Sequence, residues 1–256
     1  MPIAIRDATE IAGLRRAARE VMAILAVLRA AVRPGVSTGK LDALARRELA
    51  ARGARSNFAG YVPLQGVPPY PGVICASVNE EIVHGIPGAR VLREGEIVTI
   101  DFGAIVDGWH GDSAITVEVG TVTPEVARLL EVTQEALRRG IAQARAGNRL
   151  FDIGRTIQRY VEGEGYAVIK RYTGHGIGRA LHEEPIVPNY VDPQLPNPVM
   201  RPGMVFCIEP MVAAGGPATR ELPDGWTVVT ADGRPAAHFE HMVAVTEGEP
   251  EILTAE

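Results

Sequence analysis

Hydrophobic residues recur at steps of three and four along residues 7–32, until Pro34-Gly35 ends the pattern. This spacing puts the apolar side chains on one face of a helix. A second helix is predicted from Thr38 to about Gly53. From about residue 72 the chain changes to short apolar runs separated by glycine and proline, which indicates strands. The strands predicted in this half include Val91–Leu92, Glu96–Phe102 and Ile115–Val119.

The same order of elements recurs in the second half of the chain. Thr123-Pro124-Glu125 predicts a helix start, because threonine caps helices, proline suits the first helical position and an acid suits the first turn. That helix is predicted to continue to Gly147, and a shorter helix covers about 150–162. Further strands are predicted at Ala167–Ile169, Val205–Ile208, Trp226–Val229 and Phe239–Val245.

Two helices followed by strands therefore occur twice, and no linker separates the two copies. We predict one domain, residues 1–256, with pseudo-twofold halves at about 7–120 and 121–250. Segment 184–203 contains six prolines, which indicates an ordered surface loop.

Composition narrows the classes of partner. The 256 residues are 46% hydrophobic and 22% charged, as in soluble globular proteins. A net charge of −5, with only two lysines, argues against direct recognition of nucleic acid. No stretch approaches the ~18 uninterrupted apolar residues of a membrane span, and the N-terminus does not resemble a signal peptide. The two cysteines favour a reducing compartment, so we expect a cytoplasmic protein.

Two aspartates are predicted to lie close together in a hairpin. Asp101 ends an apolar run, and Asp107-Gly108 is typical of a two-residue hairpin turn. If the turn forms there, Asp101 pairs with Ala114, and Asp112 lies diagonally on the same face, about 7–8 Å away by backbone. Two carboxylates this close repel each other, and a pair of divalent cations would remove the repulsion.

The second half contains three comparable polar residues. His175 is bracketed by glycines, whose missing side chains let another group approach closely, while Glu209 and Glu240 border apolar runs. Each residue alone fits an ordinary salt-bridged or exposed side chain. Together with the two aspartates they form four carboxylates and one imidazole, a set that suits two ions of Mn, Fe, Co or Zn. Their four negative charges would balance two divalent cations.

In order and spacing, these residues and the motifs around them resemble the methionine aminopeptidases over nearly the whole chain. The resemblance is carried by Ser77–Glu80, His84–Pro87, Asp101, His110–Asp112, Gly174–Gly178, His182–Pro185, Arg201–Met204, Ile208–Met211, Asp224–Trp226 and Glu240–His241. The short type I form, found in bacteria, matches best. This resemblance implies an α+β protein with the pita-bread fold, a curved antiparallel sheet backed by helices with pseudo-twofold halves.

The resemblance also implies a site with two divalent metal ions. Its ligands would be Asp101, Asp112, His175, Glu209 and Glu240. Asp112 and Glu240 would bridge the ions, and a bridging water would attack the scissile carbonyl. Glu209 would act as base and then acid, His182 would stabilise the oxyanion, and His84 would contact the scissile amide or the tetrahedral intermediate.

The pocket for the methionine side chain would include Tyr70, Cys75 and Trp226, although all three also fit an ordinary core. Val67 and Leu181 stand where relatives often carry aromatic residues, so a more aliphatic wall is expected. The remaining histidines, His110, His238 and His241, are interpreted as structural or as supporting the ligands.

The predicted function is removal of the initiator methionine from nascent or newly made proteins when the second residue is small. The implied partners are peptide and protein N-termini beginning with methionine, with transient ribosome contact, no membrane and a monomeric state. The alternatives are an Xaa-Pro aminopeptidase or prolidase, a metal-free binding module on the same fold, and a two-metal phosphatase.

Overall fold

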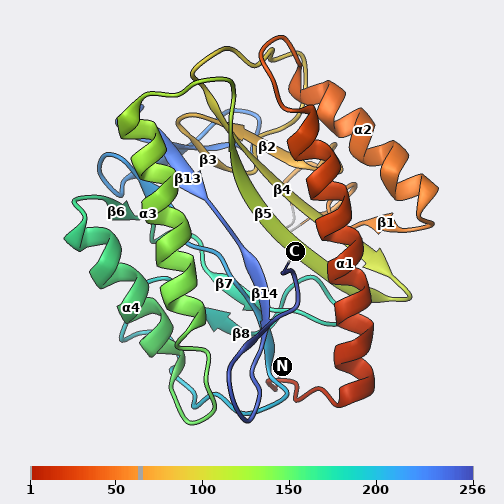
Figure 1. Ribbon diagram of the computed structural model, residues 1–256, viewed down its shortest axis with the longest axis vertical. Coiled ribbons are helices and arrows are strands. Elements are labelled where there is room, and N and C mark those ends of the chain that lie inside the picture. Colours follow the sequence, from red (N-terminus) through yellow and green to blue (C-terminus); the bar gives the residue numbers. More distant parts are fainter. Residues whose placement is uncertain (1, 63–65, 256) are drawn as a thin grey trace.

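The computed structural model describes residues 2–62 and 66–255, so both end residues of the predicted domain lie outside the described part. Each of the two predicted halves contains two helices and a set of strands (Figure 1). Two helices lie on each side of the molecule, with the strands between them. The helices are α1 (Ala8–Ala31), α2 (Thr38–Ala51), α3 (Pro124–Ile141) and α4 (Leu150–Gly163).

The helices begin at the capping residues that their sequences contain. Asp7 accepts a hydrogen bond from the Glu10 backbone N–H, and the Glu10 side chain accepts one from Asp7 in return, which forms a capping box. Thr123 caps α3 with proline at the first helical position, as predicted. Helix α1 buries one apolar face, including Leu14, Val21 and Leu28.

Helix α3 ends at Ile141 and does not continue to Gly147 as the pattern predicted. The side-chain amide of Asn148 donates to the Gln143 carbonyl, which replaces helical hydrogen bonding there. Gly147 has a φ of +90° and its N–H donates to the Met200 carbonyl, so the chain turns toward a distant segment.

The first half contains the predicted hairpin, with β4 (Ile97–Val106) and β5 (Trp109–Glu118). Asp107 and Gly108 both have positive φ, as a type I′ turn requires. The register pairs Asp101 with Ala114 and Gly103 with Asp112, so the predicted diagonal placement of the two aspartates is confirmed. Strands β1 (Arg55–Ser56) and β2 (Cys75–Val78) pair with β4 on its other side.

The second half contains a five-stranded antiparallel sheet in the order β15-β14-β9-β7-β8. Its strands are β7 (Gly174–Gly176), β8 (Glu183–Val187), β9 (Val205–Ile208), β14 (His241–Ala244) and β15 (Glu251–Ile252). Two three-stranded sheets complete the fold, β13-β10-β6 and β11-β12-β3. Their strands are β3 (Glu81–Val83), β6 (Ala167–Val168), β10 (Met211–Ala213), β11 (Thr219–Glu221), β12 (Val228–Thr230) and β13 (Ala236–His238).

Two predictions, one of a loop and one of a strand, need correction. Residues 183–187 form strand β8 at the edge of the five-stranded sheet, so segment 184–203 is not loop throughout. An edge position tolerates Pro185, which has no N–H to donate to a neighbouring strand. Val91–Leu92 is not a strand, because Val91 makes only an isolated bridge to Ser37.

The two halves meet where β5 lies against the segment that leads into β14. The Glu240 N–H donates to the Ala114 carbonyl at 2.9 Å, and the Ser113 hydroxyl donates to the Glu240 carbonyl at 2.6 Å. The Thr116 hydroxyl donates to the His238 carbonyl at 2.8 Å. This contact between halves, called the seam below, brings residues of both halves to one place. Among the described residues, no helix is long and apolar enough to cross a membrane.

Candidate metal centre and active site

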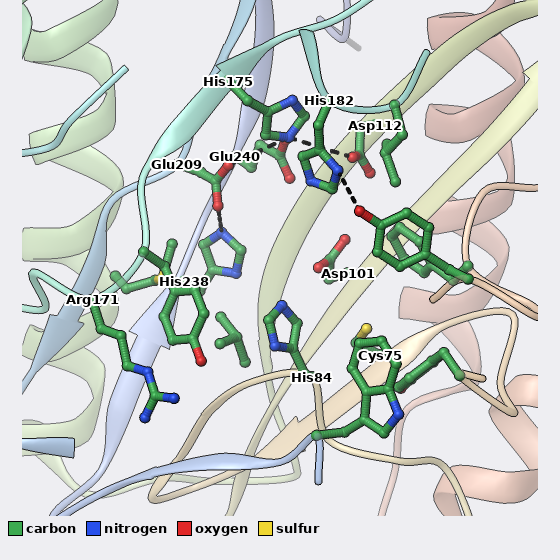
Figure 2. Close-up of a pocket in the computed structure, with 18 of the residues that line it drawn as sticks. Cys75, His84, Asp101, Asp112, Arg171, His175, His182, Glu209, His238 and Glu240 are labelled. Atoms are coloured by element: carbon green, nitrogen blue, oxygen red, sulfur yellow. Dashed lines mark hydrogen bonds and ion pairs between the residues drawn. The ribbon is translucent and has the colours of Figure 1, made fainter. Parts of the chain in front are cut away.

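A cavity of about 400 Å³ lies at the seam (Figure 2). Every site residue predicted from the sequence lines it, although the residues come from segments far apart in the chain. These ten residues are Tyr70, Cys75, His84, Asp101, Asp112, His175, His182, Glu209, Trp226 and Glu240. The structure therefore brings together the complete predicted set, while the role of each residue stays a prediction.

The hairpin supplies the two aspartates to this cavity. Gly103 lies opposite Asp112, and a Cβ at Gly103 would be 2.9 Å from Asp112 Oδ1 and 2.2 Å from Asn57 Nδ2. Glycine at this position therefore leaves the room that the Asp112 side chain occupies. Asn57 Nδ2 donates to the Gly111 carbonyl at 2.9 Å, which holds the adjoining backbone of β5.

His175 lies on β7, which packs closely between its two neighbouring strands. A Cβ at Gly174 would lie 2.2 Å from the Cys207 carbonyl oxygen, and one at Gly176 would lie 2.2 Å from the Glu184 carbonyl oxygen. Both glycines therefore allow β7 to fit closely between β9 and β8, as the sequence predicted. Glu209 follows β9 directly and Glu240 precedes β14 directly, so both carboxylates emerge from paired strands.

The donor atoms of these residues converge. Carboxylate oxygens of Asp101, Asp112 and Glu240 lie within 4.8 Å of one another. A second group with the same spacing joins Glu240 to His175 and Cys207. His175 Nε2 lies 3.6 Å from Glu209 Oε1 and 3.9 Å from Asp112 Oδ2. Figure 2 shows the labelled carboxylates and imidazoles pointing into one shared space.

The buried oxygens of this cluster fit a divalent cation. Asp101 Oδ1, Asp112 Oδ1 and Glu240 Oε1 are inaccessible to solvent and have no hydrogen-bond partner among the described residues. Burying unpaired carboxylates is costly unless a cation or a proton compensates. Oxygen donors with one imidazole are the ligands that divalent Mn, Fe, Co and Zn accept. The donor set thus matches the predicted metal centre.

Burial raises the pKa of the four acids and lowers the pKa of the imidazole. It raises the pKa of Asp101 to about 7 and raises the pKa of Asp112, Glu209 and Glu240 well above the usual range, and neighbouring carboxylates add to the rise for these three. Burial lowers the pKa of His175 to about 3, with a smaller contribution from His182. His175 is therefore neutral at physiological pH, which is the form that binds metal.

Metal binding at this cluster is expected to release protons. Because the pKa of Asp101 is about 7, a proton competes with the cation below pH 7, and the apparent affinity rises as the pH rises. Titration calorimetry with Mn²⁺ from pH 6 to 8, in buffers of different ionisation enthalpy, measures the protons released. Asp101→Asn should release fewer protons, because an amide has none to give up in this range. An affinity independent of pH would contradict the expectation.

His84 and His182 reach the cavity from different elements. His182 precedes β8, its Nδ1 lies 3.0 Å from the Tyr61 hydroxyl, and its ring centroid is 4.3 Å from that of His175. His84 follows β3 with a φ of +61°, and its ring contacts Tyr172 at 5.2 Å. Burial lowers the pKa of His84 to about 4 and also lowers the pKa of His182. Both imidazoles are therefore neutral near pH 7.

An apolar wall lies beside these polar groups. The Tyr70 hydroxyl donates to the carbonyls of Ile74 and Gly85, and Trp226 Nε1 donates to the Pro68 carbonyl. The rings of Tyr70 and Trp226 meet edge to face at 5.0 Å. Their polar atoms are thus satisfied by backbone, which leaves the ring faces for apolar contact. The lining also includes the aliphatic residues Val67 and Leu181.

Some cavity residues were missed from the sequence, and one was given only a supporting role. His238, interpreted as structural or as supporting the ligands, has its Nε2 3.6 Å from Glu209 Oε2, and neither of its ring nitrogens has a hydrogen-bond partner among the described residues. Its position two residues before Glu240 on an apolar strand was the available signal. Tyr61, Arg171 and Tyr172 also line the cavity, and no motif in the sequence indicated them.

Comparison with known proteins identifies the family. Residues 12–247 match the model of metallopeptidase family M24. The chain is an M24 metallopeptidase. It is 48% identical over 256 residues to the methionine aminopeptidase of Aquifex aeolicus, with 99% of each chain covered. It is 47% identical over 245 residues to methionine aminopeptidase 1 of Bacillus subtilis, with 96% of each covered.

Solved structures of similar proteins confirm the predicted pita-bread fold. The crystal structure of the Thermotoga maritima methionine aminopeptidase superimposes with a TM-score of 0.93, at 40% identity and with all of both chains covered. An Xaa-Pro dipeptidase from Bacillus anthracis superimposes with a TM-score of 0.78 at 25% identity. That match covers 98% of this chain but only 62% of the dipeptidase, which is the longer protein.

Proposed function

We propose that this M24 metallopeptidase is a type I methionine aminopeptidase, which removes an N-terminal methionine when the second residue is small. The observation that carries the proposal is the cavity at the seam, where a buried donor set, two neutral histidines and an apolar wall meet. The relatives of matching length named methionine aminopeptidase support it. The prolidase alternative has less support, because the similar Xaa-Pro dipeptidase is a longer protein of which only 62% is covered.

Membership in a metallopeptidase family also disfavours the metal-free binding module and the phosphatase. The cytoplasmic location, the monomeric state and the ribosome contact stay predictions from the sequence.

The metal ligands in this proposal are Asp101, Asp112, His175, Glu209 and Glu240, which would hold two divalent ions of Mn, Fe, Co or Zn. Glu240 belongs to both donor groups, which supports a shared ligand there. When bound, the ions would act as Lewis acids that polarise the scissile carbonyl and favour deprotonation of water.

Glu209 is proposed to transfer the protons of the reaction. It would accept a proton from the attacking water and then donate it to the leaving amine. One of its oxygens faces His175 and the other faces His238, each at 3.6 Å, so the carboxylate lies between two imidazoles. Burial raises the pKa of the Glu209 carboxyl, and the charges of Asp101 and Asp112 add to the rise.

His182 is proposed to donate a hydrogen bond to the developing oxyanion. Burial raises the pKa of the Tyr61 hydroxyl, which therefore keeps its proton and can donate to His182 Nδ1. That hydrogen bond places the imidazole proton on Nε2, the nitrogen left to donate to substrate. His84, also neutral, would contact the scissile amide or the tetrahedral intermediate.

The substrate side chain is proposed to lie against Tyr70, Cys75 and Trp226. Cys75 pairs directly with Asp101, so the apolar wall adjoins the acidic cluster. A free α-amine near Asp101 would be attracted by these carboxylates, which favours cleavage only at the N-terminus. The aliphatic Val67 and Leu181 suit the flexible, unbranched methionine side chain.

The metal-loaded protein is expected to cleave Met-Ala-Ser and to leave Leu-Ala-Ser and Xaa-Pro peptides largely intact. Branching at Cγ makes leucine a poorer fit than methionine, and a pocket of this kind discriminates by about 10–200-fold. Release of the first amino acid, followed by chromatography, measures the rates. N-acetyl-Met-Ala-Ser is the control for the free amine and should not be cleaved. Equal rates on Met-Ala-Ser and an Xaa-Pro peptide would favour the prolidase alternative.

A further inference from the structure

The loop that carries His182 is held by Arg6, a residue outside every motif of the site. Residues 177–182, called the His182 loop here, connect β7 to β8, which begins at Glu183. Glu183, next to His182, forms an ion pair with Arg6, which precedes helix α1. The side chains are only 11% and 15% exposed, so water screens this pair less than a surface pair.

The Glu183 carboxylate accepts hydrogen bonds from the backbone of the His182 loop. Its Oε1 accepts hydrogen bonds from the backbone N–H groups of Arg179 at 2.8 Å and Ala180 at 3.0 Å. Its Oε2 is the atom paired with Arg6. A Cβ at Gly178 would lie 2.0 Å from Arg6 Nη2, so the guanidinium packs directly against the loop backbone. One carboxylate thus joins the loop to the guanidinium.

Arg6 itself is held by rigid parts of the fold. Its N–H donates to the Gly203 carbonyl at 2.7 Å, and the Gly203 N–H donates to the Val245 carbonyl, just beyond β14. Its guanidinium also lies 3.4 Å from Glu10 in the first turn of α1 and 5.6 Å from the Trp109 ring centroid. These contacts fix Arg6 to α1 and to the hairpin of the first half.

We propose that Arg6 is a positioning residue, which acts through Glu183 to hold His182 at the substrate. The inference rests on the proposed role of His182 in the reaction. Among residues 2–62 and 66–255, the side chain that hydrogen-bonds the His182 imidazole is Tyr61 alone, so the backbone of its loop must supply much of its placement. A displacement of about 1 Å in a catalytic group can cost a hundredfold in rate.

The test is a double-mutant cycle on Met-Ala-Ser with the metal-loaded protein. Arg6→Ala should lower kcat between tenfold and a hundredfold with KM within about twofold, because the loss affects the reacting geometry and not binding. Arg6→Lys keeps a positive charge and should recover part of kcat. Arg15→Ala is the matched control: it removes a half-buried ion pair between helix α1 and Glu251 and should leave kcat unchanged.

The decisive comparison is made in a His182→Ala background. There Arg6→Ala should lower kcat no further, because the residue through which it acts is gone. If the reductions in kcat caused by Arg6→Ala and His182→Ala multiply in the double variant, the positioning role of Arg6 is wrong while the role of His182 stands. If His182→Ala alone retains wild-type kcat, both the proposed role of His182 and this inference are overturned. Circular dichroism and thermal unfolding of each variant confirm that it is folded.

Discussion

Replacement of Glu209 by glutamine is expected to lower kcat on Met-Ala-Ser at least about a thousandfold, which corresponds to about 4 kcal/mol of activation free energy. Glutamine preserves the shape of the side chain but cannot accept a proton from water. Loss of a general base costs about 10²–10⁴-fold on its own. Any weakening of metal binding adds to this, because Glu209 also lies 3.6 Å from His175 among the proposed ligands.

Two measurements separate these contributions. The metal content of the purified variant shows whether the donor set is intact, and kcat at saturating metal shows the loss of proton transfer. Glu135→Gln is the matched control, because Glu135 is a carboxylate on the outside of α3 that pairs with Arg138 and Arg139. Turnover by Glu209→Gln within tenfold of wild type would remove Glu209 from its assigned role.

Gly174→Ala is expected to destabilise the protein by about 3 kcal/mol, the upper end of what an overpacked position costs. The added methyl group would lie 2.2 Å from the Cys207 carbonyl and 3.1 Å from the Val187 carbonyl. Both are backbone atoms of neighbouring strands, so neither moves without displacing a strand. His175 follows directly, and we therefore also expect weaker metal binding. Urea unfolding measures the change in stability.

The control for this substitution is Gly163→Ala at the end of α4. A Cβ at Gly163 meets no atom within 4 Å, and alanine is the better helix former. Its stability should therefore equal or slightly exceed that of wild type. If Gly174→Ala unfolds at the same urea concentration as Gly163→Ala, the close packing of β7 against β9 does not constrain the site.

Local sequence predicts the part of the site that one hairpin determines. The turn at Asp107-Gly108 sets the register, and the register places Asp101 and Asp112 on one face. The glycines around His175 likewise indicate the close approach that the structure contains. In each case the cause lies within a few residues of the effect, so pattern and turn chemistry are sufficient.

Contacts between distant segments are not visible in the pattern. His238 approaches Glu209 because β13 pairs with β10 and places His238 opposite Met211, two residues after Glu209. Tyr61 approaches His182 from a loop about 120 residues earlier. The end of α3 depends on Asn148 and on the segment around Met200, which helix periodicity does not include. The motif resemblance predicted which residues come together in the site. The residues that contact them, such as His238 and Tyr61, could be identified only from the fold.

The seam has a consequence for how the protein is held together. The first half contributes Asp101 and Asp112 to the donor set, and the second contributes His175, Glu209 and Glu240. Neither half is a complete chelator, so cations bound by all five residues would act as a staple between the halves. The free energy of metal binding would then become part of the free energy of folding. Catalytic competence and the docking of the halves would be lost together when the cations are withdrawn.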